Sequence, residues 1–326
     1  MMPMQETLGA FRAAVLTGWI ALSAAGLLYT RQKDIPLWAA IPLIAAFLLE
    51  YLFYLVPGSE TVRERLRVKL NHWQLALALA LTALLPYLLY SIATGQFRWI
   101  AAGELCVIVA LVSFWYVALR PSPFSDVLFL VLLAALVLSR ILNQIYTSPI
   151  SVRVDILGHL MLIRTGVMAA LELRRMHGIR FGFIPSQREW ITGVRYFFYL
   201  LPVVLPLSLG LGVIHLNFTG FLFWKTAAIF FGALWVTALS EEFFFRGMLQ
   251  QWVAEWLGHP AIALIAASLL FGAVHLWFRS FPNWKMAIVA AVEGLFFGLA
   301  YRRSGSIRAS MVTHALVVTV WRTLFV

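Results

Sequence analysis

Charged residues are scarce in this chain of 326 residues. Asp, Glu, Lys and Arg together make up 12% of it, and hydrophobic residues make up 62%. An ordinary soluble domain has about 25% charged and about 45–50% apolar residues. The mean hydropathy is +0.87. This composition excludes a typical soluble domain and predicts a protein that lies in a membrane.

Cysteine is almost absent as well. The single one, Cys106, lies in an apolar segment, so the chain can form neither an internal disulfide nor a four-thiolate zinc site. A basic stripe of the kind that binds nucleic acid is also missing, although the net charge is +11. The basic residues are scattered between apolar segments, as anchors at a membrane surface are. We therefore expect no nucleic-acid partner.

Three motifs of intramembrane proteases do not occur. The chain has no H-E-x-x-H of site-2-type metalloproteases, no G-x-G-D of presenilin-like aspartyl enzymes and no G-x-S-G of rhomboid-like serine enzymes. Ser240 adjoins two glutamates, but no base stands at a suitable position beside it. A serine nucleophile is therefore disfavoured.

The sequence does have a series of long apolar segments. Each is close to the length of about 20 residues with which a helix crosses a bilayer, and lipid leaves few alternatives to the helix. The segment at 156–173 carries three polar residues and could lie in the membrane interface instead. We expect an all-α, polytopic transmembrane helix bundle of about eleven helices, in the plasma membrane if the cell is bacterial. The predicted spans are 8–30, 37–57, 72–93, 99–119, 126–146, 156–173, 193–214, 221–247, 260–278, 285–301 and 307–326.

The segment MHGIRFGFIPSQREW, from Met176 to Trp190, is the best candidate for a domain boundary. It combines glycine, proline and charge between apolar runs. We assign residues 1–185 to N-terminal transmembrane helices of unknown role and residues 186–326 to a second domain. In the first part, Glu50, Glu104 and Arg140 are expected to be buried in the membrane, where they pair with one another or line a path.

The later part contains LSEEFFFRGMLQ, which places Glu241, Glu242 and Arg246 inside an apolar run. Charges are costly in lipid unless they are paired or functional. On a helix Glu242 and Arg246 share a face and can neutralise each other. Glu241 points about 100° away and is left over. One interpretation is a buried charge network that only fixes packing; the other is a surplus carboxylate that needs a proton, a metal ion or a histidine partner.

Two histidines, His275 and His314, lie within late apolar helices. Glu241 precedes Gly258 by 17 residues and His275 follows it by 17, so the two lie at one level in an antiparallel pair of helices. His314 lies eight residues beyond Ser306, the expected N-cap of the last helix. Its meeting with the other two requires a tilt, a kink or an offset helix end.

A carboxylate beside two histidines suits hydrolysis if water can reach it. The glutamate can act as a general base, and the histidines can polarise the water or hold a metal ion that does so. Zinc bound by Glu241, His275 and His314 with one open position is the expected cofactor. Iron and manganese stay open as alternatives.

These residues, in this order, resemble the CPBP family of intramembrane proteases. That family includes the type II CAAX prenyl endopeptidases and bacterial proteins linked to bacteriocin processing or immunity. The resemblance covers about residues 186–326. It rests on E-E-x-x-x-R at Glu241, Glu242 and Arg246, on F-x-x-x-H at Phe271 and His275, and on EGLFFGLAYRRSGSIRASMVTH from Glu293 to His314.

The resemblance implies an intramembrane metalloendopeptidase that cuts a membrane-anchored or lipidated peptide or protein. It also implies a role for each residue of the motifs. Glu241 would activate the attacking water, Glu242 would be held by Arg246, and His275 and His314 would bind the metal ion or assist the water and the oxyanion.

The sequence departs from the family at one position. The family often has Asn four residues after the last histidine, whereas this chain has Val318. A valine side chain cannot donate a hydrogen bond to an oxyanion. Thr319, Arg322 or a backbone amide are the candidates to replace that donor.

Two other functions stay open from the sequence. The first is a catalytically weak immunity or scaffolding membrane protein, which Val318 supports. The second is an ion-coupled transporter in which Glu241 and the histidines relay protons or bind an ion. A smaller motif, G-x-x-x-G at Gly294 and Gly298, predicts a close contact between helices and not a substrate groove.

Overall fold

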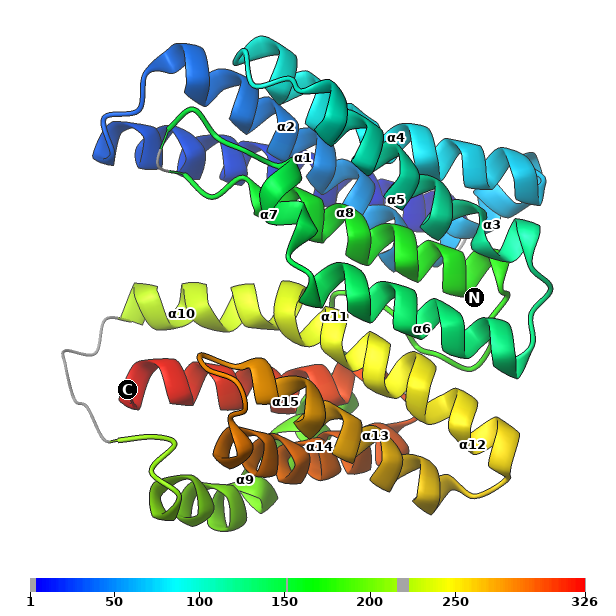
Figure 1. Ribbon diagram of the computed structural model, residues 1–326, viewed down its shortest axis with the longest axis vertical. Helices are drawn as coiled ribbons and strands as arrows, with labels where there is room; N and C mark the ends of the chain where they lie inside the picture. The colour runs from blue at the N-terminus through cyan, green and yellow to red at the C-terminus, as the bar shows by residue number, and fades with distance from the viewer. Residues whose placement is uncertain (1–3, 151, 216–222, 326) are drawn as a thin grey trace. The chain divides into compact units, whose positions relative to one another are not determined.

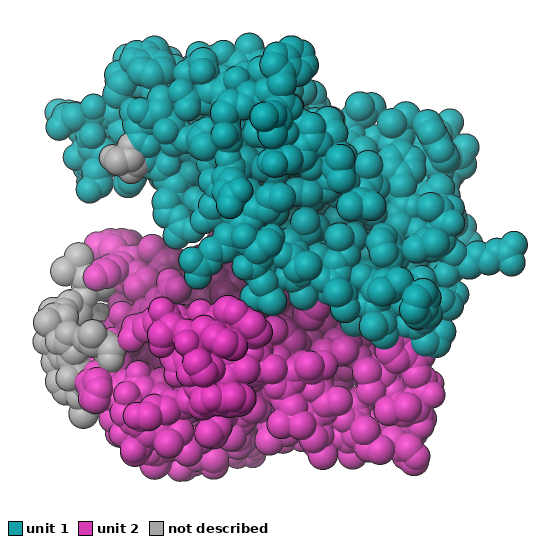
Figure 2. Space-filling model, in the orientation of Figure 1, with its two compact units in different colours: residues 1–177 teal, residues 178–326 magenta. Residues whose placement is uncertain are grey.

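The computed structural model of the chain describes residues 4–150, 152–215 and 223–325 (Figure 1). Within these ranges the protein is helical and has no β-strand, which confirms the all-α prediction. The chain divides into two compact units, residues 1–177 and residues 178–326 (Figure 2). The division falls inside the segment from Met176 to Trp190.

The first unit contains long helices joined by short turns. A single 3₁₀ turn, η1 (Val56–Gly58), follows the second helix, and a π-helical turn, η2 (Ala169–Leu173), extends the last one. The helices are α1 (Met4–Gln32), α2 (Leu37–Leu55), α3 (Glu60–Lys69), α4 (His72–Ala93), α5 (Trp99–Ala118), α6 (Pro123–Leu138), α7 (Ile141–Ile145) and α8 (Asp155–Met168).

The second unit is built around one long helical run followed by a hairpin. The run consists of α10 (Phe223–Gly232), η3 (Ala233–Ala238), α11 (Leu239–Glu242), η4 (Phe243–Gln250) and α12 (Gln251–Leu257), of which η3 and η4 are π-helical. The other elements are α9 (Gln187–Gly210), α13 (Pro260–Val274), the 3₁₀ turn η5 (His275–Trp277), α14 (Trp284–Ser304) and α15 (Ile307–Leu324).

Nine helical segments of the described residues are long and apolar enough to cross a membrane, and the protein is an integral, multi-pass membrane protein. Each of the nine corresponds to a predicted span, and the doubtful segment at 156–173 is among them as Asp155–Leu173. The others are Leu8–Gln32, Leu37–Gly58, His72–Ala93, Trp99–Ala118, Gln187–Gly210, Phe223–Leu257, Pro260–Trp277 and Trp284–Ser304.

The two remaining predicted spans differ from the structure. The prediction of one span at 126–146 is wrong, because α6 ends at Leu138 and Arg140 adopts a left-handed conformation with φ 55° before α7 begins. The 16 residues of α6 extend only about 24 Å, less than the roughly 30 Å of a bilayer core. The span at 307–326 corresponds to α15, which is not among the nine. Residues 221, 222 and 326, at the ends of predicted spans, lie outside the described residues.

One buried ion pair dominates the polar interior of the first unit. The Arg164 Nε donates to Glu50 Oε1 over 2.6 Å, and Arg164 Nη2 donates to the Thr82 carbonyl oxygen. Both charged side chains are buried. Glu50 of α2 thus pairs with Arg164 of α8, and not with Arg140, which was one of the two alternatives left open from the sequence. Glu104 and Arg140 are exposed at the surface of the unit.

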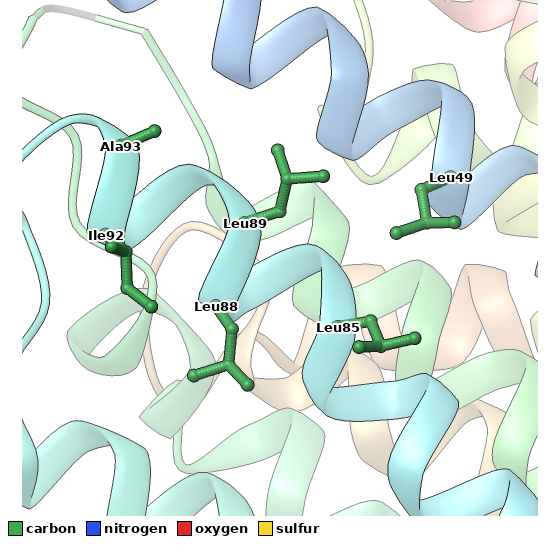
Figure 3. Close-up of a pocket in the computed structure, with 6 residues that line it drawn as sticks. All are labelled: Leu49, Leu85, Leu88, Leu89, Ile92 and Ala93. Atoms are coloured by element: carbon green, nitrogen blue, oxygen red, sulfur yellow. The ribbon is translucent and has the colours of Figure 1, made fainter.

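An apolar pocket of about 370 Å³ lies between α2 and α4 of the first unit (Figure 3). None of its lining residues carries a polar side chain, so it offers no group for catalysis. The pocket is lined by Leu49 of α2 and by Leu85, Leu88, Leu89, Ile92 and Ala93 of α4.

In the second unit, Gly258 ends the long run in the left-handed conformation, with φ 68°, and α13 turns back along it. The rings of Phe245 and Phe271, each 13 residues from Gly258, meet edge to face at 5.0 Å between centroids. This contact confirms the antiparallel register predicted from equal spacing about Gly258. Glu241 and His275 lie one turn beyond it.

Three interactions fix α15 within the second unit. Ser306 caps its first turn as expected, since its hydroxyl accepts from the Arg308 backbone N–H. The Arg308 guanidinium pairs with Glu189 of α9 at 2.9 Å. Further along, the Thr313 hydroxyl donates to the Gly193 carbonyl oxygen of α9 over 2.9 Å. These bonds set the rotation of α15, and with it the direction of His314.

Glycines bring α14 close to its neighbours. A methyl group on Gly294 would lie 3.1 Å from Ser268 Cα and 3.3 Å from Arg246 Nη2, and one on Gly298 would strike Leu264 and Gln250. The G-x-x-x-G motif therefore makes the close helix contact that the sequence predicted. The same holds for Gly272 of α13, where a methyl group would lie 2.5 Å from the Ala287 carbonyl oxygen of α14.

We predict that Gly272→Ala lowers the free energy of unfolding by about 1–3 kcal/mol, because the added methyl group forces α13 and α14 apart. The control is Gly232→Ala in α10, where a methyl group meets no atom within 4 Å and helix propensity alone acts. Thermal unfolding of the purified variants in detergent measures both. Equal stability of the two variants would contradict the close approach at Gly272.

Candidate active site

Glu241 and Glu242 occupy a short α-helical segment between two π-helical ones. The segment α11 holds one turn, with η3 before it and η4 after it. A π-helical turn changes the rotation of the residues that follow and is found often at functional sites. Within α11, adjacent residues point about 100° apart, so the two glutamates face different neighbours.

Glu242 is fully buried and held from two sides. Its Oε2 lies 3.2 Å from Arg246 Nε, without the alignment of a hydrogen bond, and its Oε1 accepts from Arg246 Nη1 over 3.3 Å. The same Oε1 lies 2.8 Å from His314 Nδ1. Because a carboxylate accepts, this nitrogen carries the proton of the bond. Glu242 thus links α11 to α15 and has little freedom to act as a base.

Arg246 is buried completely as well, which requires partners on every side. Its Nη2 donates to the Gly294 carbonyl oxygen over 2.9 Å. Three aromatic rings lie around the guanidinium, with centroids 5.7, 4.8 and 5.5 Å from its central carbon: Phe245, Phe271 and Phe297. Cation–π contacts of this kind compensate part of the lost hydration.

Glu241 is the more open of the two carboxylates. About a third of its side chain is exposed, and it accepts no hydrogen bond from the described residues. Its Oε2 lies 3.9 Å from His314 Nε2, too far for a direct hydrogen bond. Glu241 is therefore the carboxylate of the pair that can contact a water molecule.

His314 lies between the two glutamates and its ring is held in a fixed plane. The ring stacks on Phe297 of α14, with centroids 4.7 Å apart and planes inclined by 11°. Its Nδ1 is engaged by Glu242, so Nε2 faces Glu241. The structure thus brings together four of the five residues predicted for the site: Glu241, Glu242, Arg246 and His314.

The fifth, His275, lies at the end of α13 and is half-buried. Its Nδ1–H donates to the Phe271 carbonyl oxygen over 2.7 Å, which leaves Nε2 without a partner among the described residues. The ring of Phe271 lies 4.8 Å from the His275 ring and 5.9 Å from the His314 ring. The two imidazoles therefore flank one phenylalanine and do not touch each other.

The predicted zinc ligands do not form a complete site in this arrangement. Among the described residues, no group of three or more His, Cys, Asp or Glu side chains is placed to hold a metal ion. Glu241 and His314 Nε2 are close enough to share an ion, but a catalytic zinc has three protein ligands. His275 does not supply the third from its present position.

The structure adds one residue that the sequence argument left without a role, Glu293 of α14. Its side chain is only 5% exposed, and its Oε1 has no hydrogen-bond partner among the described residues. It interacts electrostatically with His314 and Glu241. A lone glutamate in an apolar helix was the available signal, but the rotation of that helix was unknown.

Two of the candidates to replace the family asparagine are engaged elsewhere or exposed. The Thr319 hydroxyl donates to the Ala315 carbonyl oxygen within its own helix, and Arg322 is exposed. Ser240 likewise donates to the Thr237 carbonyl oxygen. The nearest side-chain nitrogen that the structure places against Glu241 is His314 Nε2, at 3.9 Å.

Comparison with known proteins identifies the same region. Residues 223–320 match the family model of the type II CAAX prenyl endopeptidase Rce1-like proteins, and this range contains Glu241, Glu242, Arg246, His275 and His314. It contains none of the first unit. No solved structure matches the chain.

A curated relative is the uncharacterized protein YpbD of Bacillus subtilis (strain 168). It is 31% identical over 84 residues, which are 26% of this chain and 39% of YpbD. The chain thus aligns with less than half of that relative, and the name of the relative states no activity. Through residues 223–320, which are less than a third of the chain, this protein is similar to the Rce1-like family of type II CAAX prenyl endopeptidases.

Proposed function

We propose that the second unit is an intramembrane endopeptidase that hydrolyses a peptide bond in a membrane-anchored or lipidated peptide, with Glu241 as the base. The family supports an endopeptidase in general. The observation that carries the assignment to Glu241 is the contrast between neighbours: Glu242 is buried and bonded twice, whereas Glu241 is a third exposed and faces a histidine nitrogen.

In the first step, Glu241 takes a proton from a water molecule whose oxygen attacks the carbonyl carbon of the scissile bond. The product of this step is a tetrahedral intermediate with one negative oxygen, and Glu241 is then protonated. A base held next to the water contributes about 10²–10⁴-fold to such a rate.

In the second step, the C–N bond of the intermediate breaks. The leaving nitrogen receives the proton that Glu241 took from the water, so that Glu241 is again a carboxylate. The products are a carboxylic acid and an amine, and the atoms of one water molecule are divided between them.

The negative oxygen of the intermediate needs hydrogen-bond donors, and Val318 supplies none. We assign this role to the Nε2–H groups of His314 and His275 in their protonated form, in which both ring nitrogens donate. The Nδ1 atom of each ring is already bonded, to Glu242 and to the Phe271 carbonyl oxygen respectively. Each ring therefore has its Nε2 oriented away from the protein atom that holds it.

Zinc stays a prediction from the sequence, and no step above depends on it. Metal analysis of the purified protein beside His275→Ala tests it. A stoichiometric ion that is lost in the variant would make His275 a ligand. Equal, substoichiometric metal contents in both proteins would remove zinc from the reaction.

We predict that Glu241→Gln lowers peptide cleavage by about 10²-fold or more, because an amide cannot accept the proton of the water. Cleavage is measured by mass spectrometry on acylated and prenylated peptides, with the protein reconstituted in liposomes. Stability in detergent is expected to be retained, because Glu241 is partly exposed and bonded to none of the described residues.

The matched control is Glu255→Gln in α12. Glu255 is an exposed glutamate of the same helical run and accepts only from Gln251. This variant is expected to cleave at the wild-type rate. Cleavage by Glu241→Gln at the rate of Glu255→Gln would rule out Glu241 as the base.

We predict that Arg246→Gln lowers the free energy of unfolding by about 3–5 kcal/mol, because it leaves Glu242 as an uncompensated buried charge. Arg322→Gln, an exposed arginine in the same unit, is the control and is expected to change stability by less than about 0.5 kcal/mol. Thermal unfolding in detergent compares them. A stable Arg246→Gln protein would contradict the role of this ion pair in holding Glu242.

Val318 favours one second candidate, a catalytically weak immunity or scaffolding protein that binds peptides and cuts them poorly. Wild-type protein and Glu241→Gln would then bind a membrane peptide equally and cleave it in neither case. The ion-coupled transporter has no such support, since no contact of the described residues favours it over hydrolysis.

A further inference from the structure

We propose that Glu293 binds the substrate and selects a peptide with a basic side chain next to the scissile bond. This inference rests on the proposed function and deepens it. Three observations support it: the face of α14 on which Glu293 lies, the unpaired oxygen of its carboxyl group, and the balance of charges around Glu241.

Glu293 lies on the face of α14 that borders the site. It precedes Phe297 by four residues, and residues four apart share a helix face. Phe297 is the residue that stacks on His314 at 4.7 Å. The carbonyl oxygen of the next residue, Gly294, accepts a hydrogen bond from Arg246 Nη2. Glu293 is thus one turn from the stacked ring and beside the residue that holds the guanidinium.

Its carboxyl group is almost fully buried and incompletely bonded. Glu293 Oε1 is enclosed by protein and accepts no hydrogen bond from the described residues. Leaving a buried acceptor without a donor is costly, about 1–3 kcal/mol and more for a charged group. The Glu242–Arg246 pair also has atoms without an aligned partner, Oε2 and Nε. Both helices thus carry buried polar atoms that have no hydrogen-bond partner among the described residues.

The charges of the site favour a cationic ligand. Glu242 is matched by Arg246 and bonded to His314. Glu241 and Glu293 remain, and both interact electrostatically with the single imidazole of His314. Two carboxyl groups beside one imidazole leave the site without a matching cation, and a bound cation would offset the burial that disfavours the charged form of Glu293. Such a site attracts a basic group and repels an acidic one.

The chemical class that meets these conditions is an ammonium or guanidinium group on an extended peptide. It can donate to Glu293 Oε1 while the neighbouring peptide carbonyl lies against Glu241 and His314. Lysine and arginine both supply it on a flexible apolar stem, which suits a site within the membrane. An aspartate or glutamate at the same position would be rejected.

The test compares acylated peptides that differ at one residue beside the cleaved bond, which is Lys, Gln or Glu. With the wild-type protein in liposomes, we expect kcat/KM to be at least about tenfold higher for the Lys peptide than for the Gln peptide, and lowest for the Glu peptide. Glu293→Gln is expected to reduce the ratio of Lys to Gln to about one, mainly through KM. Glu255→Gln is expected to keep the wild-type ratio.

Binding to Glu241→Gln protein in nanodiscs is measured in parallel, by fluorescence anisotropy with the same labelled peptides. The proposal is supported, even without turnover, if the Glu241→Gln protein binds the Lys peptide more tightly than the Gln peptide. This preference should be lost when Glu293→Gln is added. Equal binding of the Lys and Gln peptides would overturn it. Absence of cleavage by the wild-type protein with every peptide would instead count against the endopeptidase, so the two failures are distinguishable.

Discussion

The buried Arg246 guanidinium is the constraint on which the geometry of the second unit depends. A cation without any exposed surface inside a membrane protein requires an anion, further acceptors and polarisable neighbours at once. Glu242 supplies the anion, Gly294 of α14 the carbonyl oxygen, and Phe271 of α13 a ring. One side chain thereby ties three helices together. Since Glu242 is held in this pair, it can also orient His314 of α15, whereas Glu241 accepts no hydrogen bond from the described residues.

Local spacing made part of this arrangement predictable. A Glu–Arg pair four residues apart on a helix meets whatever the rest of the fold does. Equal spacing about Gly258 likewise determines the register of a helical hairpin, and the contact between Phe245 and Phe271 confirms that register. Both features depend only on residues close in sequence or on one turn. The depth of His314 did not follow from the sequence, because it depends on Arg308 pairing with Glu189 of a helix more than a hundred residues away.

The sequence predictions that differ from the structure share one cause with the unpredicted depth of His314. Hydropathy treats 126–146 as one span, because it averages over Arg140 and cannot detect a left-handed residue. Glu50 was expected to pair with Arg140 or to line a path, yet its partner is Arg164, which lies 114 residues later. Glu293 received no role because the rotation of α14 is set by glycines that let it approach Ser268 and Arg246 closely. In each case the missing information was a contact between helices, which no local pattern contains.

The site also illustrates how one residue type takes three roles by its partners alone. Glu242, Glu241 and Glu293 have the same carboxyl group, but the first is bonded twice, the second is partly exposed and the third is enclosed with an unpaired oxygen. On the proposed mechanism Glu242 holds a histidine, Glu241 takes a proton from water, and Glu293 binds a basic group of the substrate. The assignment also bears on Val318. With both histidine Nδ1 atoms held by protein acceptors, the Nε2–H groups of the protonated rings are the donors that the proposed mechanism assigns to the oxyanion. On that mechanism, the loss of the family asparagine is tolerable only while both rings keep their present orientation. On the proposed mechanism, catalysis therefore depends on Glu242 and the Phe271 carbonyl as much as on the base itself.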